Sequence, residues 1–212
     1  THGSQFLVEK HPELIDAEYA LTEAGGMTVH LGQTRLYPIQ VAEKSVCWLR
    51  MRTRGKPGHA SVPHTDNAVF HLAQALEKIR RAGHLPVHVT PTFQAMLSAA
   101  GAQISFPVRM ATQALQSPGL VSLAINRMKG PGRNFLNALT TNTISATMLE
   151  AGSKVNVIPS SAEVALDCRL VPGQTPEDVM REIKAITGDQ VELEVVYASS
   201  GAAFSTETEL YK

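Results

Sequence analysis

The arrangement of this chain is set by residues 54–63, which read RGKPGHASVP. Two glycines and two prolines in this stretch predict a tight, stiff loop, because glycine permits backbone angles closed to other residues and proline fixes its own. The loop presents one imidazole, that of His59, which can donate a hydrogen bond or change its charge near neutral pH. A lone loop histidine can also do no more than satisfy a turn, so both interpretations of His59 stay open.

Regular elements are predicted on both sides of this loop. Residues 46–54 alternate between mainly apolar and mainly basic side chains, and a period of two is typical of a strand with one buried face. The first face comprises Cys47, Leu49, Met51 and Thr53, and the second comprises Trp48, Arg50, Arg52 and Arg54. The arginines fit either a nucleic-acid patch or a solvated or interface face. Asp66 to Ala82 has the pattern of an amphipathic helix, with Thr65 or Asp66 as its N-cap and Gly83 beyond its end.

The second half of the chain adds further strands and a helix. Strands are predicted over residues 142–149, 162–170 and 191–197, and a helix begins with Thr175 as N-cap and Pro176 at its first position. The order strand, helix, strand, strand, helix, strand predicts an α+β fold, a split βαβ two-layer sandwich. Its four-stranded antiparallel sheet would carry two long helices on one face. Prolines divide short apolar runs at about 85–140, which predicts a helical insertion there.

The composition narrows the functional classes. Lys plus Arg and Asp plus Glu each number 19, so no net charge attracts nucleic acid or an anionic membrane. No window approaches the ~20 apolar residues of a membrane span, and the polar start does not resemble a signal peptide. Cys47 and Cys168 fall in predicted strands, at positions that suit small buried side chains. Two such cysteines do not form a disulfide scaffold, which favours a reducing compartment. We therefore expect no nucleic acid and no membrane among the partners, and a cytoplasmic location.

A second segment contains glycine and proline and is predicted to form a stiff loop, like residues 54–63. Residues 150–159 read EAGSKVNVIP, and Asp167-Cys168-Arg169 follows in the next strand. The chain thus holds, in order, a Gly-x-Pro-Gly-His-x-Ser loop, a helix, a Gly-x-x-x-Asn-x-Ile-Pro segment and an Asp-x-Arg strand. This series resembles the lid, or dimerisation, domain of the aminoacylase and carboxypeptidase family of two-zinc metallopeptidases, which includes acetylornithine deacetylase and succinyl-diaminopimelate desuccinylase. The resemblance covers most of residues 41–198, and more loosely the first forty.

The resemblance implies catalytic and substrate-binding roles. In such enzymes the loop histidine, here His59, reaches into the active site of the partner subunit and steadies the oxyanion of the tetrahedral intermediate. The residues corresponding to Asn156 and Arg169 help to bind the carboxylate end of the substrate. A guanidinium suits bidentate recognition of a carboxylate. Arg169 could instead form a surface salt bridge with Asp167 or Glu163.

A metal ligand is implied as well. Glu23 follows a short strand predicted over residues 18–22, in a setting where the resembling enzymes place a carboxylate ligand to one zinc ion. The family more often has Asn before this Glu and Gly after it, whereas Thr22 and Ala24 stand here. An ordinary surface glutamate at a strand end is the alternative.

The resemblance also implies an incomplete enzyme. It assigns residues 1–40 to the trailing part of a truncated catalytic domain, 41–200 to the lid and 201–212 to a return segment. The general base and most ligands of the two zinc ions would then lie in a missing catalytic domain of the same polypeptide, so the segment alone is expected to be inactive and not to retain zinc. The parent enzyme would be a homodimer that cleaves an amide bond in an N-acyl amino acid or short peptide. The alternative is a free-standing α+β ligand-binding or regulatory dimerisation module without catalytic activity.

Overall fold

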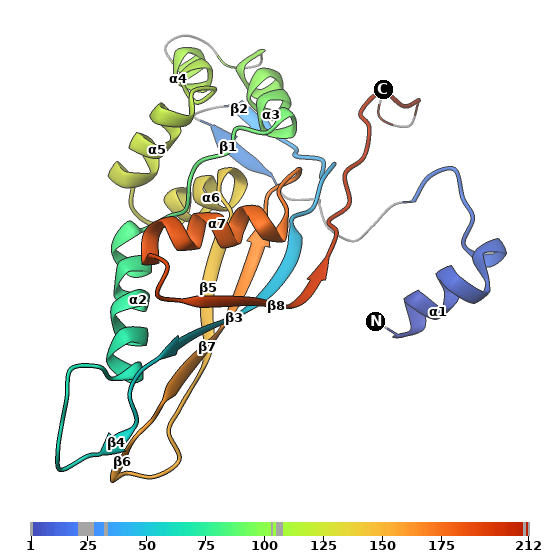
Figure 1. Cartoon of the computed structure of the whole chain (residues 1–212). Coiled ribbons are helices and arrows are strands. Elements are labelled where there is room, and N and C mark those ends of the chain that lie inside the picture. The colour runs from blue at the N-terminus through green and yellow to red at the C-terminus, as the bar shows by residue number, and fades with distance from the viewer. Residues whose placement is uncertain are drawn as a thin grey trace. The chain divides into compact units, whose positions relative to one another are not determined.

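The computed structural model describes residues 2–20, 28–31, 34–102, 104, 108–209 and 211 (Figure 1). It comprises two compact units, of which Val41–Phe204 is the larger and Thr1–Gln40 with Ser205–Lys212 is the smaller. None of the described helices has both the length and the apolar character needed to cross a membrane.

A four-stranded antiparallel sheet forms the centre of the larger unit. Its strands, in spatial order, are β5 (Thr143–Ala151), β7 (Ser161–Leu170), β3 (Ser45–Arg54) and β8 (Glu192–Ser199). The alternation predicted for β3 is confirmed, since Cys47, Leu49 and Met51 are buried whereas Trp48 is exposed. In β7 the residues from Ala162 to Leu170 alternate in the same way.

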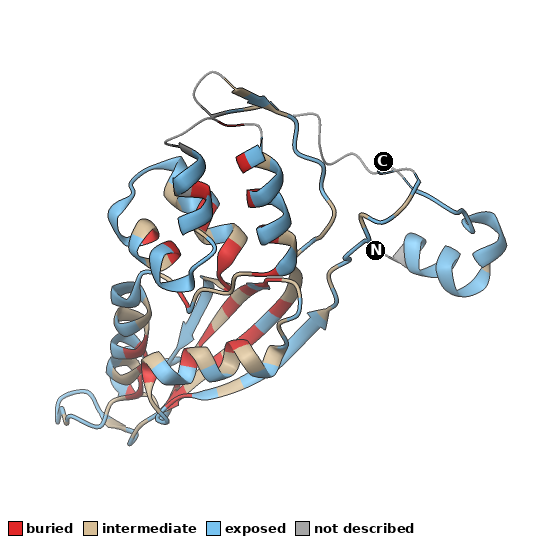
Figure 2. Cartoon of the chain, turned by 90° about the horizontal axis from the view of Figure 1, so that it is seen from above, coloured by how far each residue is buried: buried red, intermediate tan, exposed pale blue. Residues whose placement is uncertain are grey.

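Two long helices, α2 (Ala68–Ala82) and α7 (Pro176–Thr187), cover the buried face of this sheet. Their inward side chains form one core with β3 and β7, and Figure 2 shows these buried residues between the sheet and the helices. The split βαβ two-layer sandwich is thereby confirmed. One detail is wrong: α2 is capped by Asn67, whose side-chain oxygen accepts the Val69 N–H at 2.9 Å, and not by Thr65 or Asp66.

The helical insertion lies between α2 and β5. It consists of α3 (Pro91–Ala102), α4 (Val108–Ala114), α5 (Pro118–Arg127) and α6 (Pro131–Thr140). Three of these helices begin at a proline, which suits the first helical position because its missing N–H would have no intrahelical partner. They have a small core of their own, formed by Phe93, Leu97, Val121, Ile125 and Leu136. The short helices predicted from the prolines are therefore confirmed.

The smaller unit contains a helix and a hairpin. The helix α1 (His2–Lys10) is followed by the 3₁₀ turn η1 (Pro12–Leu14), and β1 (Val29–Leu31) pairs antiparallel with β2 (Thr34–Leu36). The strand predicted over residues 18–22 is wrong for its described part, because residues 18–20 form no strand and are exposed. Residues 18–20 pair with no strand among the described residues.

Candidate functional site

The structure brings the two stiff stretches of the sequence together. Within the first, β4 (Gly58–His59) pairs antiparallel with β6 (Val157–Ile158) of the second, so that His59 lies opposite Val157. The Ala60 N–H donates to the Asn156 carbonyl oxygen at 3.0 Å and extends this pairing. The two segments are about a hundred residues apart in the chain and form one projection beyond the end of the main sheet, seen at the lower left of Figure 1.

A close backbone approach holds the base of this projection. The Gly55 N–H donates to the Ser160 carbonyl at 2.9 Å, and the Lys56 N–H donates to the Asp66 carbonyl at 2.9 Å. A Cβ on Gly55 would overlap the backbone nitrogen of Ala68 and come within 2.9 Å of the Asp66 oxygen. Glycine is therefore required at this position so that β3 can pass the start of α2.

The imidazole of His59 is exposed and oriented by its own loop. Its Nδ1 accepts the Ser61 N–H at 3.2 Å and lies 2.7 Å from the Ser61 Oγ. Because Nδ1 accepts a backbone N–H, the neutral ring carries its proton on Nε2. The loop thus presents an Nε2–H donor to the surroundings of the projection.

Asn156 lies beside His59 on the same projection. Its backbone carbonyl is engaged by Ala60, and among the described residues its side-chain amide has no hydrogen-bond partner. An exposed amide with unused donors and an unused acceptor can contact a polar ligand without first breaking an internal bond.

Arg169 lies near the opposite end of the sheet. It pairs in register with Val46 and Thr143, whereas the projection starts beyond Ser161. Eight residues of extended strand separate Arg169 from Ser161, which corresponds to about 25 Å. Within one chain, the structure therefore brings His59 and Asn156 together but not Arg169.

The guanidinium of Arg169 is held by a carboxylate two residues away. Its Nε and one terminal nitrogen donate to the Asp167 oxygens at 2.7 and 3.0 Å. This hydrogen-bonded pair raises the pKa of Arg169 above its ordinary value. The ion pair with Asp167 named as the alternative from the sequence is thus present, on the sheet face that the helices leave uncovered. A ligand carboxylate at this place would have to share or replace Asp167.

Lys44 is a second cation at this end of the sheet, and the sequence analysis missed it. Its Nζ donates to the carbonyls of Ala138 and Thr141 at 3.1 and 2.8 Å and lies 3.4 Å from the Thr143 Oγ1. Burial, and secondly the nearby Arg169 charge, lower the pKa of Lys44 to about 8. Lys44 precedes β3, which begins at Ser45, and its carbonyl partners come from a distant part of the chain, so no local pattern of the sequence indicated it.

The other arginines of the uncovered face are neutralised by ion pairs. Arg50 and Arg52 both contact Glu163, and Arg54 donates to both oxygens of Glu192. These pairs form a network across β7, β3 and β8. This geometry favours a solvated surface over a nucleic-acid patch. A nucleic-acid patch needs arginines that are available to contact phosphate, and these arginines are already paired with glutamates.

The described residues offer no metal site. No group of three or more His, Cys, Asp or Glu side chains among them is placed to hold an ion. His88 contacts Glu182 at 2.6 Å, but no third ligand of these types joins them within the described ranges. Glu23, the zinc ligand implied by the resemblance, lies outside the described residues.

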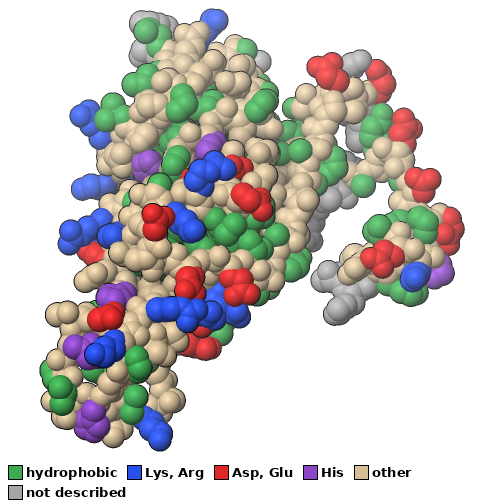
Figure 3. All heavy atoms as spheres, viewed as in Figure 1, with side chains coloured by type: hydrophobic (Ala, Val, Ile, Leu, Met, Phe, Trp, Pro, Cys, Tyr) green, Lys and Arg blue, Asp and Glu red, His purple; other side chains and the backbone are tan. Residues whose placement is uncertain are grey.

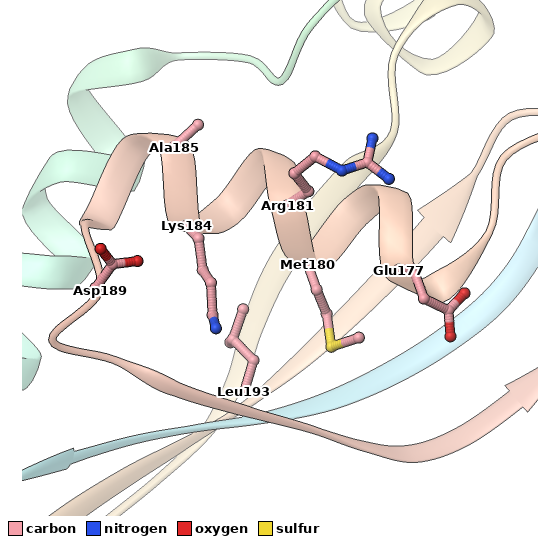
Figure 4. Close-up of a pocket in the computed structure, with 7 residues that line it drawn as sticks. All are labelled: Glu177, Met180, Arg181, Lys184, Ala185, Asp189 and Leu193. Carbon is pink, nitrogen blue, oxygen red and sulfur yellow. The ribbon is translucent and has the colours of Figure 1, made fainter.

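A separate pocket lies between α7 and β8 (Figure 4). Its lining mixes acidic, basic and apolar side chains: Glu177, Met180, Arg181, Lys184, Ala185, Asp189 and Leu193. None of the predicted site residues contributes to it. The projection that carries His59 and the sheet end that carries Arg169 therefore remain the candidate functional elements.

The sheet, its two helices and the paired projection define a two-layer α+β domain. Residues 41–192 match the family model described as a peptidase dimerisation domain. The chain belongs to this family of M20 peptidase dimerisation domains, which confirms the resemblance drawn from the motifs.

Proteins similar in sequence include N-fatty-acyl-amino acid synthases/hydrolases. Mouse PM20D1 is 29% identical over 160 residues, which cover 74% of this chain and 31% of the mouse protein. Human PM20D1 is 30% identical over 152 residues, covering 71% and 29%. A probable carboxypeptidase S-like 2 of Dictyostelium discoideum is 26% identical over 151 residues, covering 71% and 28%. The chain thus spans about a third of the length of these curated relatives.

Solved structures with a similar fold include two peptidases. The di-peptidase Dug1p of Saccharomyces cerevisiae has a TM-score of 0.49 at 11% identity, over 81% of this chain and 39% of that one. The M20 family metallo-carboxypeptidase Sso-CP2 of Sulfolobus solfataricus has a TM-score of 0.47 at 17% identity, over 81% and 47%.

Proposed function

We propose that this chain is the lid and dimerisation segment of a zinc-dependent metallopeptidase or amidohydrolase that cleaves an amide bond in an N-acyl amino acid or short peptide. Membership of the peptidase dimerisation family supports an association role. The names of the relatives, a fatty-acyl-amino acid hydrolase and a probable carboxypeptidase, support amide cleavage next to a free carboxylate. The catalytic domain would be a further part of the same polypeptide.

The placement of His59 and Arg169 is the observation that carries this proposal. Arg169 lies about 25 Å along β7 from Ser161, by the rise of extended strand, and His59 lies beyond Ser161 on the projection formed by β4 and β6. The scissile carbonyl and the carboxylate of such a substrate are only a few bonds apart, so one lid cannot apply both groups to one substrate. A homodimer resolves this, because each site then takes His59 from one subunit and Arg169 from the other.

The chemistry of His59, Asn156 and Arg169 suits a site that is shared between two subunits. The Nε2–H of His59 can donate to an oxyanion, and removal of one such donor costs about 2.7–4 kcal/mol of transition-state stabilisation. Asn156, beside His59, offers its amide to the same substrate. Arg169 can exchange part of its pairing with Asp167 for the substrate carboxylate. Zinc, held by other residues of the parent enzyme, would activate the attacking water.

An open strand edge is available for the homodimer. The outer edge of β5 pairs with no other strand among the described residues. It carries Met148 and Leu149, with 62% and 61% of their surfaces exposed. Unpaired edges with apolar side chains favour association with another copy.

The test is complementation between two inactive variants of the parent enzyme. We expect His59→Ala and Arg169→Ala each to lose most of their amidohydrolase activity as homodimers. After the two are unfolded and refolded together, random pairing should restore about one quarter of the wild-type sites, because half of the dimers then contain one intact site.

The matched control mixes His59→Ala with the double variant His59→Ala/Arg169→Ala, which cannot assemble an intact site. Recovery in the first mixture and none in the control would support His59 acting in trans. Equal, negligible activity in both mixtures, with mixed dimers demonstrated by tagged subunits, would contradict it.

A further inference from the structure

Charge is strongly segregated along this chain, although its net charge is zero. Residues 78–149 contain no Asp or Glu. The same stretch contains seven of the 19 Lys and Arg residues, namely Lys78, Arg80, Arg81, Arg109, Arg127, Lys129 and Arg133. In Figure 3 the upper-left lobe, where α3 to α6 lie, shows hydrophobic, basic and histidine side chains and no acidic ones.

Helix α5 is apolar on its outer face as well as on its inner face. Val121 and Ile125 are fully buried in the small core of the insertion. Leu120 and Leu123, each 45% exposed, lie on another face together with Arg127, because residues three and four apart are neighbours on a helix. A helix that is apolar on both sides has a second face to cover.

The cations beside this face are free of carboxylates. Neither Arg127 nor Lys129 has an acidic partner among the described residues, whereas Arg50, Arg52 and Arg54 on the sheet are all ion-paired. Met128, 40% exposed, lies between the two free cations. We call Leu120, Leu123, Arg127, Met128 and Lys129 the α5 surface.

We propose that the α5 surface docks on an anionic lipid bilayer. Leucine and methionine side chains can enter the boundary between headgroups and acyl chains while the neighbouring cations contact the headgroups. A second copy of the same face is a poorer occupant, since a two-fold contact would bring Arg127 and Lys129 of both copies into one interface that contains no carboxylate of the α5 surface to pair with them. Nucleic acid would match the charge but leave the apolar side chains uncovered.

The expected binding is weak and reversible. Few apolar side chains are involved, and each cation near an anionic surface contributes on the order of 1 kcal/mol. The proposal does not depend on the proposed function, because the α5 surface contains none of the residues assigned to the catalytic site.

The experiment measures co-sedimentation of this chain with vesicles. The probes are vesicles of phosphatidylcholine alone and of phosphatidylcholine with phosphatidylserine. We expect binding to the anionic vesicles only, and a decrease as salt is raised. Arg127→Gln/Lys129→Gln should weaken partitioning by at least about tenfold, given the contribution of each charge, and Leu120→Gln/Leu123→Gln should also weaken it.

The control Lys154→Gln/Lys184→Gln removes two exposed cations from elsewhere in the larger unit. It should bind as the unaltered chain does. Equal binding to neutral and anionic vesicles, no binding to either, or an equal loss in the control would overturn the proposal. So would concentration-dependent self-association that Leu120→Gln/Leu123→Gln abolishes, because the face would then be an interface between copies. Circular dichroism of each variant verifies that these exposed substitutions leave the fold intact.

Discussion

His59 is presented by a loop whose geometry depends on a residue without a side chain. Gly55 lies where the end of β3 passes the backbone at the start of α2, and it also donates to Ser160. The projection thus begins at a fixed contact between three elements. The position of the imidazole follows from this contact and from the pairing with β6.

Substitution of Gly55 should therefore destabilise the chain. We expect Gly55→Ala to lower the free energy of unfolding by about 1–3 kcal/mol, the range for overpacking. Gly119→Ala is the matched control, since its new Cβ meets nothing closer than Ser117 Oγ at 4.0 Å. In helix α5 that change should be neutral or stabilise by up to ~1 kcal/mol. Urea unfolding of both variants measures the difference, and equal midpoints would contradict the overlap at Gly55.

The two cysteines should be unreactive in the folded chain. Cys47 and Cys168 face each other across β3 and β7 as free, buried thiols. Burial raises the pKa of both, and that of Cys168 reaches about 12. Because the thiolate is the reactive form, we expect no labelling of Cys168 by iodoacetamide at pH 8 until urea unfolds the protein. Mass spectrometry of labelled peptides measures this, and rapid labelling without urea would show that the site is open.

At the scale of elements, the start of α2 shows how a cap is chosen. Thr65, Asp66 and Asn67 are all residues that favour the N-cap position. The side-chain oxygen of Asn67 accepts the Val69 N–H. The backbone N–H of Lys56 donates to the Asp66 carbonyl, and this bond fixes the backbone at Asp66, one residue before the cap. The contact with a distant loop residue decides between three similar candidates.

Asn67→Ala should then cost about 1 kcal/mol of stability, the usual value of a lost cap. Thr65→Ala is the control, since the Thr65 side chain makes no hydrogen bond with a described residue and should change the unfolding free energy by less than ~0.5 kcal/mol. Thermal and urea unfolding of the two variants compare them. A larger loss for Thr65→Ala would mean that the cap is misassigned.

Much of the fold could be predicted from the sequence because its elements are long and strongly patterned. The alternation in β3 and β7 and the cap at Thr175 are local signals, and all three are confirmed. The pairing of Gly58–His59 with Val157–Ile158 could not be derived from periodicity, since two-residue strands have no measurable period. The environment of the Lys44 ammonium could not be derived either, because its carbonyl partners are Ala138 in α6 and Thr141 just after it.

The chain as a whole has no net charge, but its charges are unevenly distributed along the sequence. Equal numbers of acidic and basic residues led to the expectation of no membrane partner. All Asp and Glu residues lie outside residues 78–149, and several of them pair with the arginines of the sheet. In the described part of the insertion, Arg127 and Lys129 have no carboxylate partner. A net charge of zero therefore does not exclude a locally basic surface, because residues 78–149 contain Lys and Arg but no Asp or Glu.

Lys44 couples the stability of the whole larger unit to pH. Its pKa is about 8 in the folded chain and 10.5 in the unfolded one, because burial, and secondly Arg169, disfavour the charged form. Below pH 8 both states bind the proton, so the penalty is constant. Between pH 8 and 10.5 the unfolded state binds more protons at Lys44, so the contribution of this residue to stability rises with pH through this window. The buried thiols of Cys47 and Cys168, whose pKa is raised, contribute the opposite slope above about pH 9, so the rise is read from the difference between the unaltered chain and a Lys44 variant.

Lys44→Met should remove this rise, whatever its effect on stability at neutral pH. Arg169→Gln should shrink it without abolishing it, because burial remains as the larger cause of the lowered pKa. Lys154→Met, at an exposed position, is the control and should keep the rise. The measurement is the free energy of unfolding in urea from neutral pH to pH 10.5. A pH dependence that is unchanged in Lys44→Met would show that the ammonium is as well solvated in the folded chain as in the unfolded one, and that the sheet end near Arg169 is open to water.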